Sequence, residues 1–293
     1  MTVTIASDLQ EVGRQRPEWE PWLAVIQEVL SETADAQWDA VVPDRATASE
    51  NKVPLLAGAT IAFEPTWLRR WTKSLFSTAS RSGTEKMATL NGALRETADT
   101  IPLFKASLCL NEGALKQIAV SRGADPDAFR AVAALLPVPF LYACNRRWAH
   151  SVPQDWVAGY CPICGAWPAF AEVRGIERSR YFRCGRCAGE WQVHCLVRAY
   201  CGMTDHEQLV SLVPEQGGTS RVIEACKRCL GYVKTFTTLQ ASPAARVMLD
   251  DLASVDLDIA ALERGYKRPQ GPGYSVDVTV VDKPAEKSSF WRA

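Results

Sequence analysis

Apolar residues in the first half of the chain recur at steps of three and four, the spacing of a helix with one buried face. The clearest cases are the faces that run from Trp19 to Leu30 and from Trp67 to Leu75. Pro21 and Pro65 stand near the start of these segments, where proline is tolerated. The same spacing predicts further helices at about residues 86–97, 103–121, 126–136 and 139–150.

The segments between these helices lack apolar periodicity. The first 18 residues are polar and weakly periodic, and we expect a frayed lead-in. Residues 43–60 and 80–86 are rich in small and polar side chains, which favours connections. Since this half shows neither strand alternation nor a repeating strand-helix rhythm, residues 1–152 are predicted to form a mostly helical domain.

The pattern changes after Ser151. Short aromatic and β-branched runs at 168–173, 180–183 and 232–239 are flanked by glycine and cysteine, which predicts strands in a cysteine-rich region over residues 153–240. For residues 241–268 we predict a C-terminal helix that packs on the rest of the chain, begins near Pro243 and ends at Gly265. Residues 269–293 predict a flexible tail, although the run from Val276 to Val281 can add a strand. The predicted fold class is α+β.

Composition places the chain among ordinary globular proteins. Its 293 residues are 47% apolar, and Lys plus Arg balance Asp plus Glu at 33 each, so no overall charge favours nucleic acid or a membrane surface. No run of about 18 apolar residues is evident, and the N-terminus lacks the pattern of a secretion signal. We therefore expect a cytoplasmic protein, in which ten cysteines are metal ligands or buried thiols rather than disulfides.

Two Cys-x2-Cys pairs predict a four-thiolate metal centre. Cys161 and Cys164 are separated from Cys184 and Cys187 by 19 residues, a spacing typical of zinc ribbons and rubredoxin-like modules. Glycines follow the second cysteine of one pair and the first of the other, as tight turns require. Four thiolates accept zinc or a single iron, so the spacing predicts iron or zinc without choosing between them.

A second centre is predicted from a third pair. Cys226 and Cys229 need partners, and the upstream candidates are Cys201 and Cys195, with five residues between them. Because that spacing is not a standard turn, Cys195 competes for the fourth position with the nearby nitrogens of His194 and His206. The alternative is a group of merely buried cysteines.

Catalytic signatures are missing from the sequence. It has no phosphate-binding glycine loop, no nucleophile elbow and only three histidines, so we expect no enzyme and assign no catalytic residue. Cys109 and Cys144 lie in apolar helical segments, as small buried residues do. Two other functions stay open: a zinc-ribbon nucleic-acid-binding protein, which the balanced charge disfavours, and a rubredoxin-like electron carrier.

The cysteine region resembles the formate dehydrogenase accessory protein family, FdhE. The resemblance runs from about residue 137 to 268 and is carried by four groups of residues: Cys161-Pro-x-Cys164-Gly with Pro168; Arg180-Tyr-x-x-Cys184-x-x-Cys187 with Glu190 and Trp191; Cys201-Gly; and Cys226-x-x-Cys229 with Tyr232 and Lys234. It continues through Asp250, Asp251 and Asp258. The family implies a helical N-terminal part, tandem rubredoxin-like modules with iron, and a cytoplasmic assembly factor that contacts the catalytic subunit of formate dehydrogenase.

One departure from the family pattern falls on the second centre. The family usually has a Cys-x2-Cys pair where this chain has Arg198 and Cys201, and tends to have arginine where this chain has Cys195. Cysteine and arginine are thus exchanged. As partner-binding residues the sequence suggests Arg180, Arg183 and Trp191, because the basic cluster formed with Arg178 and Arg186 can meet a protein partner. The alternative is that this cluster is simply a solvated face of the hairpin.

Overall fold

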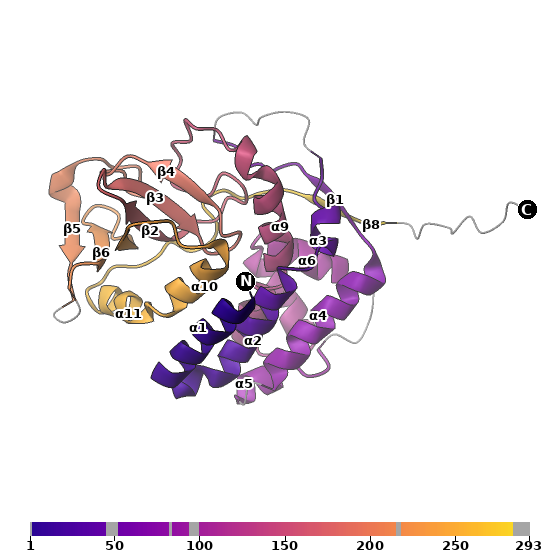
Figure 1. The fold of residues 1–293 in the computed structure, drawn as a ribbon. Helices are drawn as coiled ribbons and strands as arrows, with labels where there is room; N and C mark the ends of the chain where they lie inside the picture. The colour runs from indigo at the N-terminus through magenta and orange to yellow at the C-terminus, as the bar shows by residue number, and fades with distance from the viewer. Residues whose placement is uncertain (1, 45–51, 82–83, 94–99, 215–217, 284–293) are drawn as a thin grey trace, which may run out of the picture.

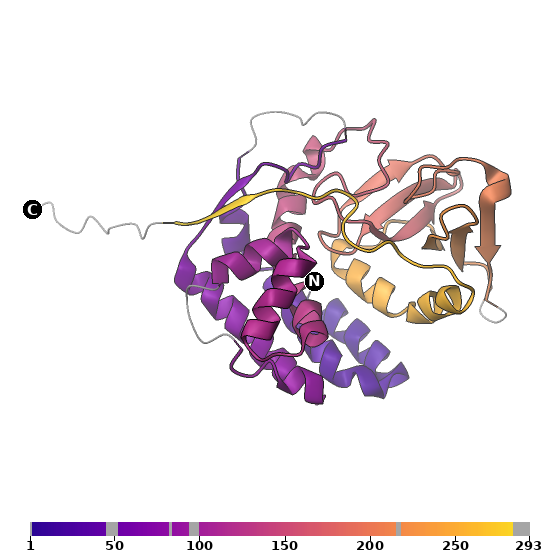
Figure 2. The same cartoon turned by 180° about the vertical axis from the view of Figure 1, so that it is seen from behind.

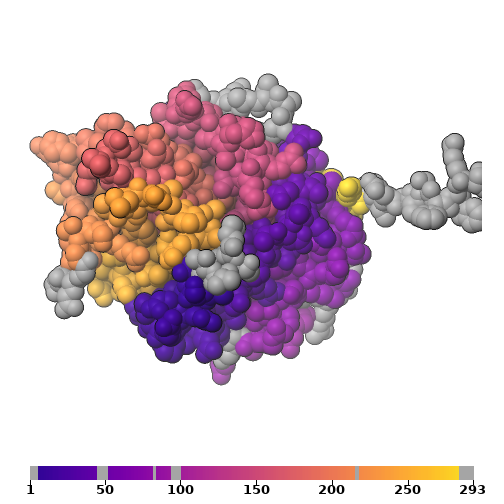
Figure 3. Space-filling view, in the orientation of Figure 1, coloured from indigo at the N-terminus to yellow at the C-terminus, as the bar shows by residue number. Residues whose placement is uncertain are grey.

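The computed structural model describes residues 2–44, 52–81, 84–93, 100–214 and 218–283 (Figure 1). A group of helices from the N-terminal half lies beside a twisted sheet from the second half, and two C-terminal helices pack beneath the sheet (Figures 1 and 2). The two halves form one continuous surface in the space-filling view (Figure 3). The predicted α+β class is confirmed.

The helical half contains nine α-helices within the described residues. They are α1 (Thr2–Gln15), α2 (Glu20–Glu32), α3 (Gln37–Ala40), α4 (Pro65–Ser80), α5 (Glu85–Ala88), α6 (Thr100–Leu108), α7 (Glu112–Ser121), α8 (Pro126–Ala133) and α9 (Val138–Trp148), with short 3-10 turns η1 (Pro17–Trp19) and η3 (Ala149–Ser151). Side-chain caps fix several starts: Glu64, Asn111 and Asp125 each accept backbone N–H groups of the helix that follows.

Aromatic side chains fill the centre of this half. Trp38 and Trp67 have ring centroids 4.5 Å apart, and Phe63 meets Phe104 edge-to-face at 4.6 Å. Trp71 lies against Trp38 and donates its indole N–H to the carbonyl of Leu136. The tryptophan-rich face predicted for α4 is therefore a core face, whereas the buried face of α2 is aliphatic and its Trp22 is half-buried.

Six strands form one sheet in the order β4-β3-β2-β7-β6-β5. Their bounds are β2 (Pro168–Arg174), β3 (Ser179–Cys184), β4 (Glu190–Val193), β5 (Leu209–Leu212), β6 (Arg221–Cys226) and β7 (Tyr232–Thr238), with the turn η4 (His206–Gln208) before β5. Strands β2 to β4 are one antiparallel module and β5 to β7 a second, and β2 and β7 join them in parallel, with Phe170 beside Lys234. The rings of Phe170 and Phe236 stack across this junction, at 4.6 Å.

The C-terminal helical segment is two helices rather than the single one predicted. Helix α10 (Ala244–Leu252) ends where the Ser254 hydroxyl donates to the carbonyl of Asp250, and α11 (Val255–Glu263) follows. Gly265, at φ +84°, lies just past α11, as expected of a helix-ending glycine. A buried Lys234 ties this segment to β7 through ion pairs with Asp251 at 2.6 Å and Asp258 at 2.8 Å.

Two predictions about the chain ends are wrong. The first 15 residues are not frayed, because α1 packs Leu9 and Val12 against the buried side chains of α2 and Leu249 of α10. Nor are residues 269–283 a flexible tail: strand β8 (Thr279–Asp282) pairs in parallel with β1 (Thr60–Phe63), a strand in the half that was predicted to have none. The alternative of an added strand is confirmed, and residues 284–293 lie outside the described part.

The hydrophobic core crosses the predicted boundary near residue 152. Backbone hydrogen bonds tie the two sides together, since the N–H groups of Leu55 and Leu56 donate to the carbonyls of Pro162 and Ile163 at 2.7 and 2.9 Å. The Tyr142 hydroxyl also donates to the carbonyl of Ala244. The helical half and the cysteine region are therefore packed as one unit.

One helical segment contradicts the expectation about apolar runs. Pro126–Ser151, which includes α8 and α9, is 26 residues long and reaches a mean hydropathy of 1.4, enough to span a membrane by length and composition. However, 72% of that apolar window is buried inside the structure. The segment has the surroundings of a core helix.

The β1–β8 pairing yields a stability test. Val278 is 2% exposed and Val281 is 39% exposed in the same C-terminal segment. We expect Val278→Ala to lower the free energy of unfolding by about 1–3 kcal/mol, because it leaves a cavity in the core, while Val281→Ala changes it by less than about 0.5 kcal/mol. Urea unfolding followed by tryptophan fluorescence measures both values, and equal effects would contradict the packing of this segment.

Candidate metal centres

Four buried cysteines converge to form what we call the first centre. Cys161, Cys164, Cys184 and Cys187 have sulfur atoms that all lie within 4.8 Å of one another. The Sγ atoms of Cys161 and Cys187 are 3.4 Å apart, and those of Cys164 and Cys184 are 3.5 Å apart. Tetrahedral ligands at metal–sulfur distances of about 2.3 Å are separated by roughly 3.8 Å. The arrangement therefore fits a thiolate-bound metal with only a small adjustment.

Turn geometry directs these sulfurs inward. In the first turn the N–H of Cys161 donates to the carbonyl of Ala166, and Gly165, at φ +74°, donates back to the carbonyl of Cys161. Backbone N–H groups of Ile163, Cys187 and Gly189 point at the sulfurs of Cys161, Cys184 and Cys187 at 3.4, 3.5 and 3.4 Å. Such N–H···S contacts stabilise thiolates and orient them toward a metal.

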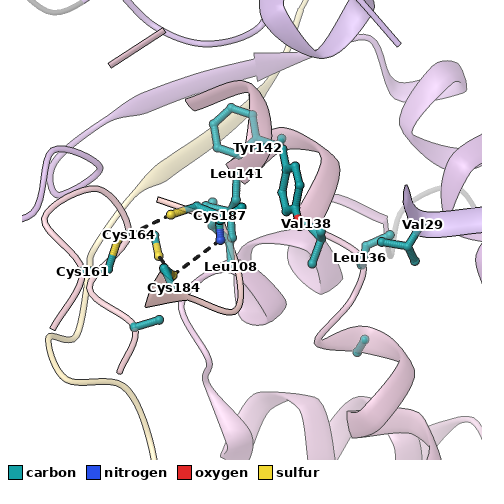
Figure 4. Close-up of a cluster of buried hydrophobic side chains, with 14 of the residues drawn as sticks. Val29, Leu108, Leu136, Val138, Leu141, Tyr142, Cys161, Cys164, Cys184 and Cys187 are labelled. Carbon is teal, nitrogen blue, oxygen red and sulfur yellow. Dashed lines mark hydrogen bonds between the residues drawn. The ribbon is translucent and has the colours of Figure 1, made fainter. Parts of the chain in front are cut away.

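The helical half covers the first centre. Figure 4 shows Leu108, Leu141 and Tyr142 close to the four cysteines. The Arg186 guanidinium, in the turn between Cys184 and Cys187, donates to the carbonyls of Ser107 and Leu108 at the end of α6. On another side the N–H of Tyr274 donates to the carbonyl of Gly165. The centre is thus enclosed by three separate parts of the chain.

Proton affinity differs among the four thiols. Burial raises the pKa of Cys161 and of Cys187 well above the usual value of a thiol. Burial acts in the same direction on Cys184, but hydrogen bonds from the other three thiols outweigh it and hold the pKa of Cys184 well below the usual value. Of these three thiols, Cys184 therefore loses its proton most readily.

Three cysteines form what we call the second centre. The sulfurs of Cys201, Cys226 and Cys229 lie within 4.8 Å of one another, and those of Cys201 and Cys226 are 3.9 Å apart. Backbone N–H groups of Cys229 and Arg228 contribute to a lowered pKa of Cys226 against the effect of burial, whereas burial raises the pKa of Cys229 to about 11. Unlike the first centre, this one reaches solvent: Cys201 is exposed and Cys229 is half-buried.

The two centres share one backbone design. The N–H of Arg198 donates to the carbonyl of Met203, and Gly202, at φ +66°, donates to the carbonyl of Arg198, which repeats the bonds of Cys161 and Gly165. The second turns match as well. The N–H of Leu230, at φ +55°, donates to the carbonyl of Cys226, and the N–H of Ala188, at φ +57°, donates to the carbonyl of Cys184. The sheet thus contains the same module twice, with Arg198 at the position of Cys161.

The structure does not bring the other proposed ligands to the second centre. Cys195 is exposed and outside the three-cysteine cluster, and its sulfur is 4.0 Å from Nδ1 of His194. His206 is exposed and lies beside Asp205. Cys195 is therefore not a fourth ligand in this arrangement, because the chain from β4 to the turn at Arg198 carries it outward. Cys144, by contrast, is fully buried, as expected, and Cys109 half-buried.

The three suggested partner-binding residues are buried. Arg180, Arg183 and Trp191 are 4%, 2% and 3% exposed. Arg183 pairs with the buried Glu172 at 3.1 Å, and Arg180 donates to the carbonyls of Cys195 and Val197. The Trp191 indole donates to the carbonyl of Ala158. The prediction that these three side chains contact a partner directly is therefore wrong for this conformation. They instead hold the first module and the loop that follows it together.

Comparison with known proteins agrees with this geometry. A family model described as the FdhE C-terminal domain matches residues 193–272, which include the second centre. The FdhE homolog of Aquifex aeolicus is 28% identical over 141 residues, or 47% of this chain and 48% of that protein, and the homolog of Pseudomonas aeruginosa is 33% identical over 152 residues, or 46% and 49%. Over about half of its length the chain is therefore similar in sequence to FdhE proteins.

The FdhE likeness extends differently in sequence and in fold. By sequence the chain spans about half the length of the curated FdhE relatives it matches. By fold it matches the crystal structure of the FdhE protein from Pseudomonas aeruginosa with a TM-score of 0.59 over 94% of this chain and 95% of that one, at 20% identity. The FdhE architecture is therefore shared by both halves.

Loss of a first-centre ligand tests whether this centre binds metal and supports both halves. Cys164→Ser is expected to lose metal and several kcal/mol of stability, because structural zinc contributes about 10–16 kcal/mol of binding free energy that is also folding free energy. Since the core is continuous, amide exchange should quicken in α9 as well as in the sheet. Metal analysis and hydrogen exchange measure this, with Cys109→Ser as control; unchanged metal content, or an unaffected α9, would contradict it.

Metal affinity at the first centre is expected to decrease as the pH is lowered. The metal-free centre retains protons on Cys161 and Cys187, whose pKa values burial raises, so binding releases at least these two protons. Each displaced proton makes affinity change by roughly tenfold per pH unit below its pKa, hence about a hundredfold for two. Competition with a chromophoric chelator across a pH series gives the slope, and a pH-independent affinity would contradict the assignment.

Proposed function

We propose that this chain is a cytoplasmic accessory protein that binds the catalytic subunit of a formate dehydrogenase and assists its assembly, without oxidising formate itself. The observation that carries the proposal is the pair of cysteine centres built on one sheet in a chain similar to FdhE proteins. The family match falls on the second centre and the C-terminal helices that pack beneath the sheet. Shared function is best sought in that region.

We further propose that both centres bind iron or zinc. Cys161, Cys164, Cys184 and Cys187 would hold the first metal, and Cys201, Cys226 and Cys229 the second. Bound zinc would stabilise the fold, whereas iron in a thiolate site adds one-electron chemistry. The protein supplies the enclosing turns, the N–H···S contacts and the cover of helices.

The described residues favour an accessory role over catalysis. All three histidines of the chain are exposed. A hollow of about 800 Å³ between the helices and the first module is lined by Trp156, Tyr181 and Trp191 and by Arg183 and Glu190, which pair with each other at 3.3 Å. This hollow offers no nucleophile with an adjacent base, which supports a binding protein.

Burial also weighs against the two other candidate functions. A nucleic-acid-binding ribbon needs exposed cations, yet Arg180 and Arg183 of the basic hairpin are internal and ion-paired. An electron carrier exchanges electrons through a metal close to its surface, which weighs against this role for the first centre, whose four ligands are at most 1% exposed, but not for the second. Burial thus weighs against the basic hairpin as a nucleic-acid surface and against the first centre as an electron-transfer site, which favours protein binding.

Recovery of bound partners tests the proposal. We expect the full chain, tagged and expressed in its own host, to co-purify with the catalytic subunit of a formate dehydrogenase and to show no formate oxidation alone. Cys226→Ser should reduce recovery of the subunit, because it removes a proposed metal ligand next to the family-matched surface, whereas Cys109→Ser should not. Mass spectrometry of the eluates and formate oxidation assays measure this. Recovery equal to that of a tag-only control would sink the proposal.

A further inference from the structure

Arg198 occupies the place of a metal ligand. Its backbone makes the hydrogen bonds that Cys161 makes in the first centre, and three residues later Cys201 stands where Cys164 stands. The two modules therefore align turn for turn, with four sulfurs in one and three sulfurs and an arginine in the other. A single substitution separates the two ligand sets.

Arg198 is also buried without a partner. It is 5% exposed, and none of its three guanidinium nitrogens has a hydrogen-bond partner. The neighbouring Arg180 does not compensate its charge, since Arg180 is itself a cation that pairs with Glu224 and donates to backbone carbonyls. Buried charges in proteins are nearly always paired. A buried guanidinium without a hydrogen-bond partner thus belongs to the residue that stands, by the alignment of the turns, where the first centre has a ligand.

A metal bound at the second centre supplies the matching negative charge. A divalent metal with three thiolates carries a net charge of about −1, and a fourth thiolate would make it −2. Replacing the fourth cysteine with arginine both removes a donor and adds a cation. The site is then one ligand short and electrostatically suited to accept an anion.

Access to the second centre is open from solvent. Cys201 is exposed, and Leu230, in the turn after Cys229, is 47% exposed. Lys227 and Arg228, between Cys226 and Cys229, are both exposed and add positive charge at the rim. At the first centre the corresponding turn residues face the helical half: Ala188 is 3% exposed, and Arg186 is bonded to α6.

We propose that the second centre binds its metal through Cys201, Cys226 and Cys229 and takes a thiolate from outside the chain as its fourth ligand, with Arg198 beside that position. The outside thiolate comes from a small thiol or from the cysteine of a partner protein. This proposal rests on metal binding at the second centre and is independent of formate dehydrogenase as the partner. Its test therefore succeeds or fails separately from the co-purification experiment.

Cadmium NMR of the full chain tests the proposal, because the ¹¹³Cd chemical shift reports the number of sulfur ligands. Loaded with two equivalents of ¹¹³Cd in thiol-free buffer, the protein should give one resonance typical of four sulfurs and a second typical of three. Titration with 2-mercaptoethanol should move only the second resonance toward the four-sulfur position. Sulfate, an anion without a soft donor, should leave both unchanged.

Three variants assign the roles. Arg198→Cys should place the second resonance at the four-sulfur position and make it insensitive to 2-mercaptoethanol. Arg198→Gln should retain the three-sulfur resonance and weaken 2-mercaptoethanol binding by about tenfold, the loss expected for one charge-assisted interaction. Cys195→Ser should leave the spectrum unchanged, because Cys195 lies outside the cluster.

Three results would overturn the proposal. They are two four-sulfur resonances in the wild type, a second resonance that Cys195→Ser displaces, and binding of only one equivalent of cadmium. An unaltered 2-mercaptoethanol affinity in Arg198→Gln would remove Arg198 from the mechanism. If Arg198→Cys fails to fold, the wild-type titration and Cys195→Ser still decide. Native mass spectrometry then separates the sources: a retained small-thiol mass supports a free thiol, and its absence with a positive titration supports a partner's cysteine.

Discussion

The convergence of four sulfurs at the junction of helices and sheet constrains most of this structure. Cys161 and Cys164 precede β2, Cys184 ends β3 and Cys187 follows it, so bringing the four together fixes that hairpin. The same turns accept hydrogen bonds from Leu55 and Leu56 and bond to the end of α6 through Arg186. A perturbation at the sulfurs is therefore transmitted to both halves through short, direct contacts rather than through a linker.

Repetition of the module has allowed the two centres to diverge. Both keep the same turn hydrogen bonds and left-handed residues, which shows that the backbone fold of the turn tolerates arginine in place of a ligand. The first copy is enclosed and contributes to the core, and the second is exposed beside basic side chains. One copy is thus suited to stability and the other to exchange with the surroundings.

The sequence predicted the features that depend on short-range patterns. Tryptophan spacing located α2 and α4, and Cys-x2-Cys spacing located both centres, because turn and helix periods are local. It failed where distant contacts decide. Arginines on β3 looked like a solvent-facing cluster, yet Glu172 on β2 and the loop at Cys195 cover them. Cys195 is near the second centre in sequence, but the direction of the loop carries it away.

Strand pairing between β1 and β8 has a consequence for synthesis. Thr60 pairs with Thr279, so β1 cannot pair until a strand more than 200 residues later has been synthesised. The same C-terminal segment runs across the molecule toward β8 (Figure 2), and the N–H of its Tyr274 donates to the carbonyl of Gly165 beside the first centre. Domains usually fold as they leave the ribosome, beginning with the N-terminal one. Here the helical half cannot reach its final packing before residues 279–282 have been made, which makes the two halves together, rather than either half alone, the unit of folding.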